Sequence, residues 1–96
     1  MRRDHVIRLI RERDEEIRAF GVRHLSLFGS VARDTAGPAS DVDVLVEFEG
    51  PITFRGHMGL LVFLEELLGT RVDLATPAML PEDVERTVSE DLLRVA

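Results

Sequence analysis

The sequence has 96 residues, 45% of them apolar, so it is long enough for one domain, residues 1–96, with a single core. Its 18 acidic and 12 basic side chains give a net charge of −6, which disfavours a stand-alone nucleic-acid binder because phosphate backbones select basic surfaces. No cysteine, secretory signal or apolar run approaching the roughly 18 residues of a membrane span is visible, so we expect a cytoplasmic protein without disulfides.

The first half of the chain is predicted to hold two helices and two strands. Apolar residues at helical spacing among charges predict an amphipathic helix over Asp4–Phe20. An alternating pattern predicts a strand over Val22–Phe28, after which Gly29 interrupts the pattern and Ser30 can cap a short helix through Ala36. A turn rich in Gly, Pro and Ser then leads into a second strand over Asp41–Phe48.

The second half begins with a loop over Glu49–Gly56 and continues with a strongly apolar helix, His57–Leu68, which Gly69 can end. A short third strand is predicted over Arg71–Ala75, and a last helix over Pro81–Val95. This alternation of helices and strands predicts the α/β (α+β) class, with a small mixed β-sheet packed with helices.

Two aspartates stand where an apolar strand is expected. Side chains on a strand alternate between its faces, so Asp41, Asp43, Leu45 and Glu47 share one face and the valines between them share the core face. Two carboxylates on one face repel each other, and a divalent metal ion would remove that cost. The alternative is a charged strand face that only meets solvent.

A second feature precedes this strand. Gly29 and Ser30 end one predicted strand and open a helix, a junction that directs backbone N–H groups and a hydroxyl toward an anion. Arg33, one turn along, could meet a phosphate or hold one of the aspartates. Taken alone, the same residues also fit an ordinary capped turn.

Together these residues read "GSVARD…SDVDVLV". This resembles "GSxARG…SDxDxLV", the recurrent motif of the minimal nucleotidyltransferase (MNT) family in the polymerase-β-like nucleotidyltransferase superfamily. The resemblance covers nearly the whole chain and implies the nucleotidyltransferase (polymerase-β-like) fold. One position differs, because Asp34 stands where the family commonly has glycine and adds negative charge near the expected triphosphate.

The resemblance also implies roles for individual residues. It implies that three carboxylates are catalytic and bind two Mg²⁺ ions, with ATP as the substrate: Asp41, Asp43 and Asp73. It implies nucleotide contacts for four residues: Gly29, Ser30, Arg33 and Ser40. An aspartate between Val72 and Leu74 is unusual for a residue without a functional role, because this short strand is otherwise apolar. An aspartate at a strand end that faces water would fit the sequence too.

The family transfers a nucleoside monophosphate from a nucleoside triphosphate to a hydroxyl and releases pyrophosphate. The best-known arrangement for members this small is a genetic pair with a HEPN-domain toxin, an RNase, so the resemblance implies an antitoxin that transfers AMP to this partner. The sequence has no tyrosine, so a tyrosine acceptor would lie on the partner. Two alternatives remain: a non-catalytic antitoxin that binds the toxin, and a small oligomeric subunit with a structural Mg²⁺.

The apolar helix over His57–Leu68 either packs only in the core or also contacts a further subunit in a homo- or hetero-oligomer.

Overall fold

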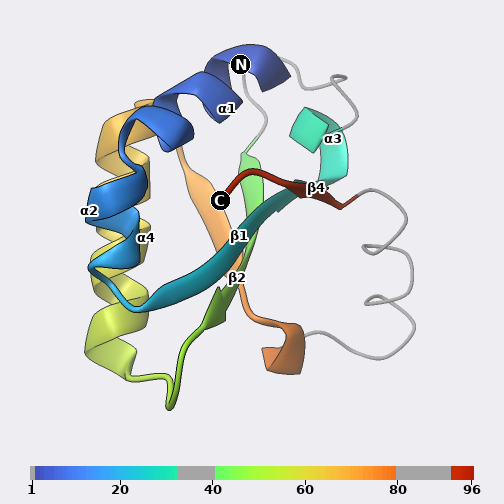
Figure 1. Ribbon diagram of the computed structural model, residues 1–96. Helices are drawn as coiled ribbons and strands as arrows, with labels where there is room; N and C mark the ends of the chain where they lie inside the picture. Colours follow the sequence, from blue (N-terminus) through green and yellow to red (C-terminus); the bar gives the residue numbers. More distant parts are fainter. Residues whose placement is uncertain (1, 33–40, 80–91) are drawn as a thin grey trace.

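A computed structural model describes residues 2–32, 41–79 and 92–96 (Figure 1). Its elements, in chain order, are α1 (Arg3–Glu12), α2 (Asp14–Arg18), β1 (Val22–Phe28), α3 (Gly29–Ala32), β2 (Val42–Phe48), α4 (Phe54–Leu68), β3 (Val72–Ala75), the 3-10 helix η1 (Pro77–Met79) and β4 (Leu93–Arg94). The four strands form one sheet in the order β3-β2-β1-β4. Strand β2 pairs antiparallel with β1 and parallel with β3, so the predicted small mixed sheet is confirmed.

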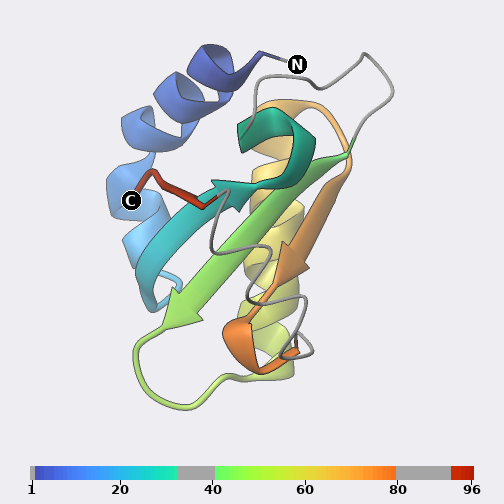
Figure 2. The ribbon, with the colours of Figure 1, turned by 90° about the vertical axis from the view of Figure 1, so that its right-hand side faces the viewer.

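The core lies between one face of this sheet and helices α1, α2 and α4. Val42, Val44 and Val46 of β2 are fully buried, while Asp43 and Leu45 between them are only partly buried. The predicted division of β2 into an apolar and an acidic face is therefore confirmed. Helix α4 lies behind the strands when the sheet is viewed from its other side (Figure 2). The helices contribute these fully or almost fully buried side chains: Val6, Ile10, Ile17, Leu60, Leu64 and Leu68.

Two helices differ from their predicted boundaries. The predicted helix Asp4–Phe20 is interrupted at Arg13, whose backbone (φ −112°, ψ 24°) separates α1 from α2. Helix α4 starts at Phe54, one turn before the predicted start, because the Thr53 hydroxyl accepts a hydrogen bond from the Gly56 N–H (2.9 Å) and caps the helix. It ends at Gly69 in the left-handed conformation, as predicted. No helix in the described ranges is long and apolar enough to cross a membrane.

The end of the chain corrects another prediction. The helix predicted over Pro81–Val95 is wrong at its C-terminal end, where Leu93–Arg94 form strand β4; residues 80–91 lie outside the described ranges. Strand β4 pairs antiparallel with β1, and the Val95 N–H donates to the Leu25 carbonyl (2.8 Å). The physical reason is tertiary: this pairing satisfies backbone groups on the outer side of β1 and buries Val95 in the core.

Candidate active site

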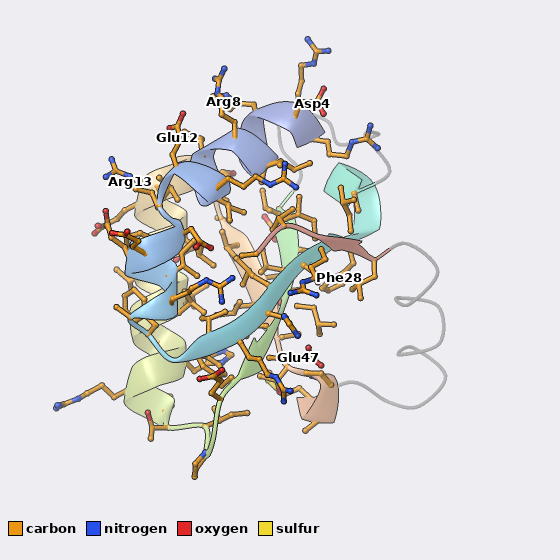
Figure 3. All side chains as sticks on the ribbon, viewed as in Figure 1. Asp4, Arg8, Glu12, Arg13, Phe28 and Glu47 are labelled. Carbon is orange, nitrogen blue, oxygen red and sulfur yellow. The ribbon has the colours of Figure 1, made fainter. Side chains whose placement is uncertain are left out.

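The sheet brings two of the predicted aspartates side by side. Asp43 of β2 is the register partner of Asp73 on the parallel strand β3, and of Phe28 on the antiparallel strand β1. Register partners point to the same face of a sheet, and adjacent strands lie about 4.8 Å apart. Asp43 and Asp73 therefore lie on the sheet face opposite α1, α2 and α4, which we call the aspartate face. Figure 3 labels two side chains on this face, Phe28 and Glu47, and both lie away from those helices.

The third predicted carboxylate, Asp41, directly precedes β2 and is exposed, as is Asp73, whereas Asp43 is partly buried. Among residues 2–32, 41–79 and 92–96, no three His, Cys, Asp or Glu side chains gather closely enough to hold a metal ion. Carboxylate oxygens are nevertheless the ligands that Mg²⁺ prefers, and like charges repel unless a cation lies between them. The donor type and strand positions thus fit Mg²⁺, and a shared ion would require the side chains to converge.

Gly29 packs directly against the Asp43 side chain. It has φ +70°, a conformation that disfavours a side chain, and a Cβ built on it would overlap the Asp43 carboxylate oxygen Oδ2 and lie 3.2 Å from Cγ. The sequence suggested that Gly29 and Ser30 form a junction that directs backbone N–H groups toward an anion. In the structure Gly29 gives room to the Asp43 carboxylate, so Gly29 and Asp43 form one packed unit.

The remaining predicted nucleotide contacts are less fully described. Ser30 lies in the backbone of α3, next to Gly29, while Arg33 and Ser40, like Asp34, fall outside the described ranges. The end of α3 is held by Arg3 of α1, whose guanidinium Nη1 donates to the Ala32 carbonyl (3.3 Å). Helix α1 therefore helps to place the segment that carries the glycine–serine motif. Further along α1, charged side chains such as Asp4, Arg8 and Glu12 lie on its outer side (Figure 3).

Sequence reasoning missed Glu65 of α4. Its Oε2 accepts a hydrogen bond from the backbone N–H of Val72 (3.2 Å), the residue before Asp73, in a partly buried position. Because β3 is an edge strand of the described sheet, this N–H has no partner strand on its outer side. Glu65 thus holds the start of the strand that carries Asp73. A glutamate in an otherwise apolar helix could have indicated a structural role. Its partner, the backbone N–H of Val72 seven residues away, could not be predicted from the spacing of residues.

Replacing Glu65 by leucine should lower the free energy of unfolding by about 1 kcal/mol, because the Val72 N–H loses its acceptor. Glu65→Gln keeps an acceptor oxygen and should retain most of that stability. Urea titrations of both variants measure the difference. Equal losses in the two variants would contradict a role for this hydrogen bond.

The mixed sheet, with aspartates on neighbouring strands and a glycine packed against one of them, is the arrangement expected of a nucleotidyltransferase. The family model described as "Nucleotidyltransferase domain" matches residues 6–95, and the chain belongs to this family. Within it the chain is a minimal nucleotidyltransferase. It is 41% identical over 76 residues to the protein adenylyltransferase MntA of Thermococcus cleftensis, covering 79% of this chain and 77% of that protein.

Solved structures agree with this assignment. A structure described as a minimal nucleotidyltransferase superposes with a TM-score of 0.82 at 35% identity and covers 97% of this chain and 95% of its own. A more distant one, the MNT antitoxin in complex with a tri-AMPylated HEPN toxin from Shewanella oneidensis, has a TM-score of 0.67 at 17% identity. It covers 94% of this chain and 71% of that chain, and at this identity it supports the fold alone.

Proposed function

We propose that this nucleotidyltransferase transfers AMP from ATP to a hydroxyl group of a partner protein. The observation that carries the proposal is the register pairing of Asp43 with Asp73, with Gly29 packed against Asp43. Support for AMP as the transferred group comes from the MntA relative, which is named a protein adenylyltransferase.

The proposed chemistry distributes roles among the residues of the aspartate face. Asp41, Asp43 and Asp73 would hold Mg²⁺, which when bound neutralises phosphate charge and lowers the pKa of an attacking hydroxyl. The acceptor oxygen bonds to the α-phosphorus, the bond from that phosphorus to the pyrophosphate oxygen breaks, and pyrophosphate leaves. Asp73 is exposed on the edge strand, and in this proposal it would accept the hydroxyl proton.

The nucleotide would lie along the start of α3. Gly29 and Ser30 open this helix, and the motif resemblance adds Arg33 and Ser40 as further nucleotide contacts. With a net charge of −6, the chain needs a cation between its carboxylates and a triphosphate. Mg²⁺ is therefore part of the proposal, and the family resemblance supplies the number of two ions.

We further propose that the acceptor belongs to a HEPN-type RNase toxin and that the chain acts as its antitoxin. The Shewanella oneidensis structure joins an MNT antitoxin to an AMPylated HEPN toxin. The sequence contains no tyrosine, so a tyrosine acceptor must lie on another protein. Asp73 is exposed and borders the sheet edge, where the hydroxyl of a second protein can reach it.

Incubating the protein with Mg²⁺, extract of its source cells and ATP labelled on the α-phosphate should label one protein band. Label on the γ-phosphate should give no band that depends on this chain, because that phosphate leaves with pyrophosphate. The size of the band identifies the acceptor. If the HEPN partner is present and no band depends on the chain, the binding-only antitoxin becomes the better account.

A further inference from the structure

The solvent side of α4 carries apolar side chains that the fold does not use. The helix buries Leu60, Leu64 and Leu68 against the sheet. On its opposite side Met58 is 37% exposed and Val62 is 49% exposed. Just before and at the start of the helix, Ile52 and Phe54 are also exposed. Four of the six large apolar side chains that are exposed in the described ranges thus lie between residues 52 and 62.

Opposite charges lie at the two ends of the apolar pair formed by Met58 and Val62. Arg55 lies three residues before Met58, and Glu66 lies four residues after Val62, so all four side chains share one side of the helix. We call this set the α4 seam. Arg55 and Glu66 are about 16 Å apart along the helix axis, too far to pair with each other. Within the described ranges neither of them forms an ion pair with another residue.

We propose that a second copy of this chain docks on the α4 seam, with the two α4 helices antiparallel about a twofold axis near residues 60 and 61. A twofold axis at this position places Arg55 of each copy beside Glu66 of the other, at both ends of the contact. Met58 of one copy then lies beside Val62 of the other. The seam is complementary to itself, which is the property that an interface between identical chains requires.

The charges also select the orientation. A parallel pair of α4 helices would bring the arginines together at one end and the glutamates together at the other, and like charges in contact weaken association. The apolar centre supplies most of the attraction, because exposed ion pairs contribute little by themselves. The seam lies on the helix side of the sheet, away from the aspartate face (Figure 2). Both active sites of the dimer therefore stay open to an acceptor protein.

Sedimentation equilibrium of the purified chain in low salt tests the dimer and its charges. We expect the wild type to dimerise, and we expect Arg55→Glu or Glu66→Arg alone to raise the dimer dissociation constant about tenfold or more, since each single change creates two like-charge contacts. The double variant carrying both changes restores opposite charges and should return the dissociation constant to near that of the wild type.

These positions are exposed, so all three variants should fold, which far-ultraviolet circular dichroism can check. Val62→Ser should also weaken the dimer, because it removes apolar contact without altering charge. A wild-type chain that stays monomeric up to about 0.2 mM, well above the concentrations at which specific dimers form, would overturn the proposal. Failure of the double variant to restore association would overturn the proposed pairing of Arg55 with Glu66 as well.

Discussion

Asp43→Asn is expected to lower the rate of AMP transfer by about 1,000-fold or more, the largest effect of any single change in this chain. Removing one carboxylate from the pair with Asp73 removes a charge that the proposed Mg²⁺ site needs. Metal coordination contributes several kcal/mol to such reactions, and each 1.36 kcal/mol is tenfold in rate. The fold should remain, because asparagine has the shape of aspartate and relieves repulsion with Asp73. Transfer of α-phosphate label to the partner measures the rate.

Glu47→Gln is the matched control for this variant. Glu47 is exposed and lies on the same strand and the same face as Asp43. The substitution removes the same charge but leaves the Asp43–Asp73 pair intact. It should keep nearly full activity. If Asp43→Asn still neutralises the toxin in cells as well as the wild type does, neutralisation works by binding and the catalytic account of the antitoxin fails.

Gly29→Ala is expected to be the second most damaging change. The residue would have to keep φ +70°, which costs about 1–2 kcal/mol with a side chain, and its Cβ would overlap the Asp43 carboxylate. We expect the free energy of unfolding to fall by about 3 kcal/mol in total, with the overlap contributing at least as much as the backbone. Displacing the carboxylate by about 1 Å should also lower activity about 100-fold.

Gly69→Ala separates these two contributions. Gly69 has nearly the same backbone angle, φ +68°, but a Cβ there would meet no atom within 4 Å. It should lose only about 1 kcal/mol of stability and keep its activity per folded molecule. Urea unfolding and label transfer on both variants give the comparison. Equal stability losses, with activity retained in both, would show that the Gly29–Asp43 contact does not matter.

Much of the fold could be predicted from local patterns. The alternation in β2 predicted correctly which side chains face the core, because a period of two leaves little choice for a half-buried strand. The break at Arg13 could not be predicted, since apolar residues keep helical spacing through it. Strand β4 could not be predicted either. Two residues are too few for a pattern, and their conformation depends on the neighbouring β1.

The site could be predicted only in part, because a sequence motif identifies residues but not their contacts across the sheet. The motif contains both Gly29 and Asp43, but only the structure shows that they are in contact. Only the sheet register shows that Asp73 is the neighbour of Asp43 on the next strand. That register depends on how α4 returns the chain to the sheet, which no short motif encodes. Glu65 and Arg3 were missed because their partners are backbone atoms, and backbone atoms leave no trace in the sequence.

The described sheet has unusually short outer strands: β4 has two residues and β3 has four. Exposed edges are where a sheet recruits strands from other molecules, in domain swapping and in amyloid. Here the Glu65 carboxylate already occupies the first outward N–H of β3. The edges thus offer a foreign strand little to extend, and the protein gains resistance to aggregation because its outermost strands are short.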